Sequence, residues 1–139
     1  MHFQTTVEIA APAATVWEVL ADVTTWPSWT SSVTSAEPLS GEPLGLGAEV
    51  RVRQPRLAPA VWRVTRFEAE QSFQWTSTSG GVTSVADHVL TELNGSTHVL
   101  LTVDQSGLLA PLIGLIFGGL TRRYLRTEAE GLKSRAERA

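Results

Sequence analysis

The chain has 139 residues, of which 42% are hydrophobic and 18% are charged, and its formal net charge is −3. These values are typical of a globular protein, and the acidic balance with dispersed arginines argues against nucleic-acid binding. The sequence has no cysteine, which excludes a disulfide framework, thiol catalysis and thiolate metal ligands. A chain of this length predicts a single domain over residues 1–139.

Two segments bear on the cellular compartment. Met1-His2-Phe3-Gln4 lacks the charged end and apolar run of a signal peptide, which predicts a cytoplasmic protein. The segment from Gly107 to Thr121 is uncharged and very apolar, but it is shorter than the roughly 20 residues of a membrane span and is interrupted by Pro111. A buried helix is the preferred interpretation of this segment, and a face that touches a membrane is the alternative.

The beginning of the chain predicts a strand followed by helical structure. Apolar and polar side chains alternate from Phe3 to Ile9, which indicates a strand with one buried face. Ala11-Pro12 ends this strand and begins a helix, since proline suits the first helical position. Pro27 is expected to stop that helix. The aromatic segment Trp26-Pro27-Ser28-Trp29 then predicts a turn or one extra helical turn.

The middle of the chain predicts a series of strands separated by turn residues. Ser40–Gly47 holds three glycines and one proline and is therefore predicted as a loop. The predicted strands are Val33–Leu39, Ala48–Arg53, Val61–Glu68, Phe73–Ser79, Val82–Leu93 and Ser96–Gln105.

Asn94-Gly95 is the strongest turn signal in the sequence, because both positions of a type I′ turn need a positive φ. If these two residues form the loop, Leu93 faces Ser96 and the pairing continues back along both strands. His88 then lies opposite Leu101, among the apolar residues that face the last helix. A register shift of one residue would reverse this assignment.

The last part of the chain predicts one long helix from residue 107 to about residue 135. Apolar residues recur there with helical spacing, which places them on one side of the helix. These residues are Leu109, Ile113, Ile116, Phe117, Leu120 and Tyr124. We expect this stripe to pack on the sheet. Gly114, Gly118 and Gly119 lie in the helix interior, where they indicate either close packing on the sheet or space for a ligand.

The order of elements and several segments resemble the START-like superfamily called SRPBCC, in particular its polyketide cyclase/dehydrase and lipid-transport branch. The resemblance covers nearly the whole chain and concerns fold signatures more than catalytic ones. Its segments are Ile9-Ala10-Ala11-Pro12, Val16-Trp17, Asp22-Val23, Trp26-Pro27-Ser28-Trp29, Trp62-Arg63-Val64-Thr65, the hairpin with His88 and Asn94-Gly95, Gly107-Leu108-Leu109 and Glu130-Gly131-Leu132-Lys133.

This resemblance implies an α+β helix-grip fold, in which a curved antiparallel sheet wraps around the long C-terminal helix and leaves a cavity between them. The family binds lipids, polyketides and other hydrophobic molecules in that cavity, and many members have no demonstrated reaction. The residues expected to line the cavity are Trp26, Trp29, Trp62, Trp75, His88, Leu90, Leu101, Ile113, Phe117 and Leu120.

Most of these candidates also have a structural interpretation. His88 is the one candidate catalytic residue, because an imidazole exchanges protons near neutral pH; otherwise it is an ordinary buried histidine that hydrogen-bonds to a neighbour. Trp17 is expected to anchor the core. Trp26 and Trp29 either shape the cavity mouth or pack their helix on the sheet, and the faces of Trp62 and Trp75 stay open.

The remaining polar residues favour no other chemistry. Arg51, Arg53, Arg63 and Arg66 lie on predicted strands, where an outward, solvated position is favoured over pairing with an acidic ligand group. His2, His88 and His98 have no metal-ligand spacing, so we expect no metal and no other cofactor.

Three functions follow for a domain of this kind. The first is a carrier or binding module for a small hydrophobic molecule, with no nucleic-acid partner and at most transient membrane contact. The second is a polyketide cyclase or dehydratase that uses His88 in the same cavity. The third is an interaction protein whose apolar helix start meets a partner or a membrane. The sequence does not indicate the ligand, the oligomeric state or whether a reaction is catalysed.

Overall fold

A computed structural model describes residues 1–41 and 43–139 of the chain; Glu42, inside the predicted loop Ser40–Gly47, lies outside the described residues. Over these residues the chain forms a seven-stranded antiparallel sheet in the order β1-β7-β6-β5-β4-β3-β2. The strands are β1 His2–Ile9, β2 Ser35–Pro38, β3 Glu49–Arg53, β4 Ala60–Glu68, β5 Ser72–Ser79, β6 Val82–Leu93 and β7 Ser96–Ser106. The helices are α1 Ala13–Ala21, the 3-10 turn Val23–Thr25, α2 Trp26–Trp29 and α3 Ala110–Glu137.

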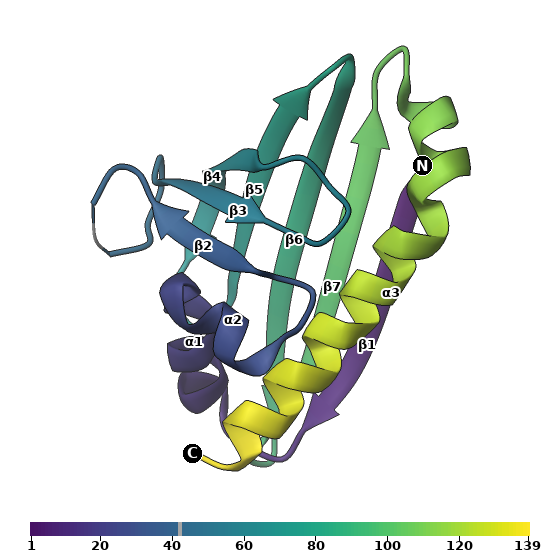
Figure 1. Cartoon of the computed structure of the whole chain (residues 1–139). Helices are drawn as coiled ribbons and strands as arrows, with labels where there is room; N and C mark the ends of the chain where they lie inside the picture. The colour runs from purple at the N-terminus through teal and green to yellow at the C-terminus, as the bar shows by residue number, and fades with distance from the viewer. Residues whose placement is uncertain (42) are drawn as a thin grey trace.

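The sheet curves around α3, which runs diagonally across it (Figure 1). The short helices α1 and α2 lie beside the C-terminal end of α3, whereas the N-terminal end of α3 lies beside the first residues of β1. The expected helix-grip arrangement of an antiparallel sheet and one long C-terminal helix is therefore confirmed.

The helical region after β1 differs from the prediction at Pro27. Helix α1 ends at Ala21, and Pro27 lies in the first turn of α2. Proline is tolerated there because the first N–H groups of a helix have no intrahelical partner. The prediction that Pro27 stops the preceding helix is therefore wrong, whereas the extra helical turn at Trp26–Trp29 is confirmed.

The hairpin of β6 and β7 has the predicted register. Asn94 and Gly95 both have positive φ, at 55° and 81°, as a two-residue type I′ loop requires. Leu93 pairs with Ser96, and His88 lies opposite Leu101. The register of the longest hairpin of the described sheet is thus set by its turn residues.

Strand β4 contains one residue more than its partner β5. The pairing shifts between Val64 and Arg66, which leaves Thr65 as a β-bulge. The extra residue changes which positions face the interior: Trp62 is partly buried before the bulge, and Phe67 is packed against the core after it. In β4, even-numbered residues therefore face inward before Thr65, and odd-numbered residues face inward after it.

Helix α3 has the predicted extent but presents a different face to the sheet. Its buried positions are all small at first and include larger residues later: Ala110, Gly114, Gly118, Leu125, Glu128, Ala129, Leu132 and Ala136. Leu109 and Ile116 of the predicted stripe are instead exposed, with 61% of Ile116 open to solvent. The prediction that these two side chains are buried on the sheet is therefore wrong; Leu109 lies against the turn at Gly81 that joins β5 and β6.

The glycines explain why the helix turns this face toward β1. A Cβ atom on Gly114 would lie 2.7 Å from the Met1 Cε atom, and one on Gly118 would lie 3.5 Å from the Phe3 ring. A Cβ on Gly119 would meet open space. Close packing, the first of the two interpretations of these glycines, therefore applies to Gly114 and Gly118 but not to Gly119.

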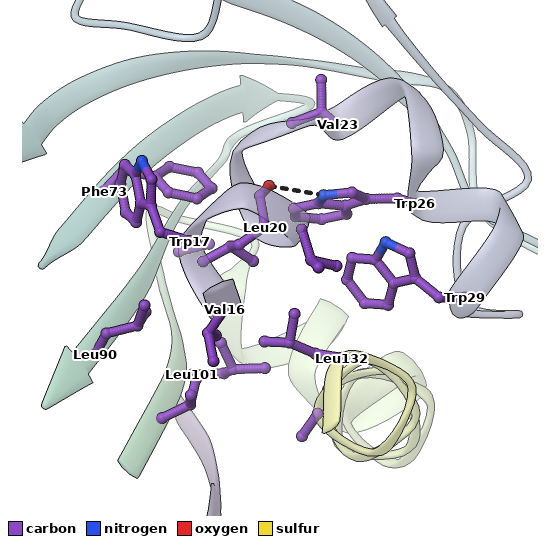
Figure 2. Close-up of a cluster of buried hydrophobic side chains, with 14 of the residues drawn as sticks. Val16, Trp17, Leu20, Val23, Trp26, Trp29, Phe73, Leu90, Leu101 and Leu132 are labelled. Atoms are coloured by element: carbon purple, nitrogen blue, oxygen red, sulfur yellow. Dashed lines mark hydrogen bonds between the residues drawn. The ribbon is translucent and has the colours of Figure 1, made fainter. Parts of the chain in front are cut away.

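The hydrophobic core is concentrated around α1, α2 and the second half of α3 (Figure 2). Trp17 is buried with its ring edge-on to Phe73, so its expected role as a core anchor is confirmed. The Trp26 Nε1 atom donates a hydrogen bond of 2.9 Å to the Leu20 carbonyl, which ties α2 to α1. A Cβ atom on Gly131 would overlap the Trp29 carbonyl oxygen, so α3 touches the backbone of α2 at this point.

Candidate ligand cavity

A cavity of about 470 Å³ lies between the inner face of the sheet and the part of α3 from Ile113 to Glu128. Small-molecule sites in proteins are typically apolar cavities of 300–1,000 Å³ with a few polar groups. Helix α3 approaches the sheet most closely along β1, where its small residues lie, and has fewer contacts with β7 and β6. The strands farther from β1 curve away from the helix and leave this space.

Three tryptophans form one aromatic wall of the cavity. The Trp75 ring lies 5.7 Å from the Trp62 ring and 5.4 Å from the Trp26 ring, measured between centroids. Trp75 and Trp26 are almost fully buried, and Trp62 is partly buried. Trp62 and Trp75, whose faces the sequence left open, both line the cavity. The opposite wall comes from Ile113 and Phe117 of α3.

The inner end of the cavity carries a buried pair of ionisable groups, His88 of β6 and Glu128 of α3. His88 is 3% exposed, and its ring stacks on the Phe73 ring with the centroids 4.1 Å apart. The His88 Nδ1 atom lies 3.3 Å from the Phe73 carbonyl, which can only accept a hydrogen bond, so Nδ1 carries a hydrogen. The His88 Nε2 atom is 3.6 Å from the Glu128 Oε2 atom, which has no hydrogen-bond partner among the described residues.

This tautomer has a chemical consequence. A neutral His88 with hydrogen on Nδ1 turns a lone pair toward the Glu128 carboxylate, which is an unfavourable contact. Both groups face the cavity, so an imidazole and a carboxyl group lie within reach of a polar atom placed beside them.

The outer rim of the cavity is formed by the β3–β4 loop, the β5–β6 turn and α3. Gln54, Arg56 and Leu57 of the loop line the rim, and Arg56 adopts a positive φ of 68°. The Tyr124 hydroxyl of α3 donates a hydrogen bond to the Pro55 carbonyl and so fastens the loop to the helix. A guanidinium at this position can pair with an acidic group of a ligand.

The sequence analysis did not identify Glu128 or Arg56. Glu128 had a detectable signal, because it lies on the same helical face as Leu125 and Leu132, where an acidic residue is unexpected. Arg56 lies between Pro55 and Pro59 in a short break between strands, and its sequence context gives no comparable signal.

Seven of the ten expected lining residues lie in the cavity wall as the described residues define it. They are Trp26, Trp62, Trp75, His88, Leu101, Ile113 and Phe117. Trp29 packs on α3 at Gly131, and Leu90 belongs to the buried core, so neither lines the cavity. Leu120 is partly buried but lies outside the lining. Of these three residues, Trp29 still contacts the lining residue Trp26, with the ring centroids 5.5 Å apart.

The strand arginines lie on the outer face. Arg51 pairs with Glu37 at 3.3 Å, and Arg66 pairs with Asp87 at 3.1 Å, both partly open to solvent. Arg53 and Arg63 are exposed. Within residues 1–41 and 43–139, no group of three or more metal-ligating side chains comes together.

The fold is similar to that of several solved structures. An aromatase/cyclase, Zhui from Streptomyces sp. R1128, matches with a TM-score of 0.81 and 22% identity over 99% of this chain and 94% of that one. A START superfamily protein from Mycobacterium smegmatis has a TM-score of 0.77 and 18% identity over 99% and 97% of the two chains. TTHA0849 from Thermus thermophilus has a TM-score of 0.78 and 17% identity over 98% and 97%. At these identities the likeness concerns the fold alone.

No curated protein sequence matches the chain. The family model described as "Polyketide cyclase / dehydrase and lipid transport" matches residues 1–137. This match extends from the first strand to the end of α3 and agrees with the segments from which the resemblance was inferred. The chain therefore belongs to the polyketide cyclase/dehydrase and lipid transport family.

Proposed function

We propose that the chain, as one domain over residues 1–139, binds a small hydrophobic molecule of lipid or polyketide type between the sheet and α3. The observation that carries the proposal is the cavity of about 470 Å³, with an aromatic wall of Trp26, Trp62 and Trp75 and polar groups at its two ends. Apolar burial supplies the affinity, and His88 and Arg56 orient polar atoms of the ligand.

The proposal is tested by binding of a long-chain fatty acid such as oleate. Binding at about one equivalent should quench part of the tryptophan emission, because three tryptophans line the cavity, and should raise the melting temperature. Ala86→Leu on β6 adds three carbon atoms to the cavity wall and should weaken binding about tenfold or more. Ala14→Leu on the exposed side of α1 is the matched control and should bind like the unchanged chain.

Equal affinity of Ala86→Leu and Ala14→Leu for oleate would contradict a site in this cavity. Mass spectrometry under native conditions, on protein purified from its own host, identifies any ligand that remains bound. A ligand with an acidic group would be expected to lose affinity in Arg56→Gln, since Arg56 lies at the rim.

A second candidate function, a cyclase or dehydratase, is favoured by the buried pair of His88 and Glu128. Their separation of 3.6 Å and their position in the cavity wall would allow proton transfer to a bound polyketide. In a carrier, His88→Gln should change affinity by at most about 1–3 kcal/mol. In an enzyme, the same change should lower turnover of a candidate polyketide by about two to four orders of magnitude with binding largely retained.

A further inference from the structure

The residues just before α3 and its first turns expose a row of large apolar side chains, which is named here the apolar tip and consists of Leu108, Leu109, Leu112, Leu115 and Ile116. Leu115 is 82% exposed, and Leu108 is almost completely exposed. Single exposed apolar residues need no explanation, but five within nine residues of one segment form a patch of the kind that marks an interaction surface. Figure 1 shows this part of α3 at the end of the molecule away from α1 and α2.

The apolar tip is followed on the same helix face by basic residues. Leu112, Leu115, Arg123 and Arg126 fall on one outward side of α3 by helical spacing, and all four are exposed. Residues 105–127 contain three arginines, Arg122, Arg123 and Arg126, and no acidic residue, in a chain whose net charge is −3. The helix therefore presents apolar side chains in its first turns and positive charge in the turns that follow.

We propose that this face of α3 docks on an anionic lipid surface, with the apolar tip inserted among the acyl chains and Arg123 and Arg126 at the level of the headgroups. Surface-bound helices combine apolar and basic side chains in this way. Among the described residues no helix is long and apolar enough to cross a membrane, so the contact is a surface contact. If two copies of the chain met through this face, their arginine-rich segments would lie together, and neither segment offers an acidic partner. Anionic headgroups supply the opposite charge.

The docking surface adjoins the cavity. Ile113 and Phe117, on the same turns as the apolar tip, line the cavity wall. The Leu109 side chain lies against Gly81 of the β5–β6 turn, where a Cβ atom would be 3.3 Å from Leu109 Cγ, and the neighbouring Gly80 lines the cavity rim. A tip inserted in a bilayer therefore holds the rim of the cavity next to the lipid. Docking itself does not require an occupied cavity.

The test is sedimentation with vesicles of phosphatidylcholine containing phosphatidylglycerol, and with vesicles of phosphatidylcholine alone. The unchanged chain should bind the anionic vesicles more tightly, and added salt should reduce this preference. The double change Leu112→Gln with Leu115→Gln should weaken binding to anionic vesicles about tenfold or more. Arg123→Gln and Arg126→Gln should each weaken it about fivefold and together remove the preference for phosphatidylglycerol.

The matched controls are Leu93→Gln and Arg63→Gln. Leu93 is 73% exposed in the hairpin of β6 and β7, and Arg63 is exposed on β4, so neither belongs to the apolar tip or to its basic continuation. Both variants should bind vesicles like the unchanged chain. All changed side chains are exposed, and circular dichroism should show unaltered folding.

Two outcomes would overturn the proposal. One is equal vesicle binding by the tip variants and the controls, including no binding by any of them. The other is a concentration-dependent dimer, seen by analytical ultracentrifugation, that the leucine double change dissociates, because the apolar tip would then be covered by a second copy. Oleate binding to the lipid-free chain is measured in parallel, and loss of oleate binding with intact vesicle binding would reject the cavity function alone.

Discussion

The two halves of α3 differ in how closely they pack on the rest of the fold. From Ala129 onward, side chains such as Leu132 point toward α1, α2 and the sheet and belong to the filled core. Before Ala129, Gly114 and Gly118 lie on the sheet side, Leu112 and Leu115 are exposed, and the side of the helix from Ile113 to Glu128 borders the cavity. Large side chains that face the core fill it in one half of the helix, the closed half. In the other half, the open half, large side chains face solvent, and a cavity remains between the helix and the sheet.

The largest effect should come from truncating the closed half. Leu132 is fully buried, so Leu132→Ala should destabilise the fold by about 2–5 kcal/mol through lost burial and the cavity left behind. Leu115→Ala, the same change in the open half, should stay within about 0.5 kcal/mol. Urea denaturation measures both free energies of unfolding. A similar loss for both variants would mean that the two halves do not differ in packing.

Glycine-to-alanine changes should give the next largest difference. Gly131→Ala places a methyl group on the Trp29 backbone carbonyl, and a shift of α2 against α3 should cost about 1–3 kcal/mol. Gly119→Ala meets open space and should stabilise the helix by up to about 1 kcal/mol.

Gly114→Ala is the intermediate case in the same series. The three atoms nearest to its new Cβ atom belong to the flexible Met1 side chain, which can rotate away. Its change in the free energy of unfolding should therefore lie between those of the other two variants. Thermal and urea unfolding of the three proteins check this order, and an unaffected Gly131→Ala would show that α3 does not touch α2 closely.

The smallest effect should be pH-dependent and lies at the last turn of the closed half. The Ala10 N–H group donates a 2.8 Å hydrogen bond to Glu137 Oε2, and Lys133 pairs with the same oxygen. The Ala10 hydrogen bond, followed by the Lys133 contacts, lowers the pKa of the Glu137 carboxyl below its usual value. The carboxylate therefore stabilises the fold above the pKa of the unfolded chain, and this contribution is lost as the pH falls through the lower folded-state pKa.

Glu137→Gln should accordingly lower the melting temperature slightly at pH 7, and the difference from the unchanged chain should shrink in acid. Glu130→Gln removes an exposed carboxylate from the same helix and serves as the control. Melting curves at pH 7 and in the acid range measure the difference. A difference that grows in acid would contradict the role given to the Glu137 carboxylate.

The sheet was predictable from the sequence because its signals are local. Asn94-Gly95 requires positive φ at two adjacent residues, and this requirement alone placed His88 opposite Leu101. Alternation of apolar and polar residues located the strands to within a few residues. The change at Thr65 from inward-facing even-numbered residues to inward-facing odd-numbered residues was not predicted. An extra residue in β4 can be recognised only once the pairing of β4 with β5 is known.

The face of α3 was not predictable from apolar periodicity. Between residues 107 and 120 apolar side chains occur around the whole helix, so large residues could be assigned to the sheet by spacing, as Leu109 and Ile116 were. The informative pattern was the small residues at Ala110, Gly114 and Gly118, four positions apart, which permit close approach to β1. Large side chains would have prevented that approach. The cavity was likewise implied by family resemblance, since its size depends on sheet curvature that no local pattern encodes.

The bulge at Thr65 also determines at which position β4 can lose a residue without changing which side chains face inward. Trp62 lines the cavity before the bulge, and Phe67 packs against the core after it. Loss of Thr65 would leave both rings on the inner face, because the residues on either side already pair with β5. Loss of Gln74 from β5, which carries no extra residue at that point, would turn one of the two flanking aromatic rings outward. In a lineage that gains and loses residues, β4 can therefore shorten at the bulge while both the cavity wall and the core are retained.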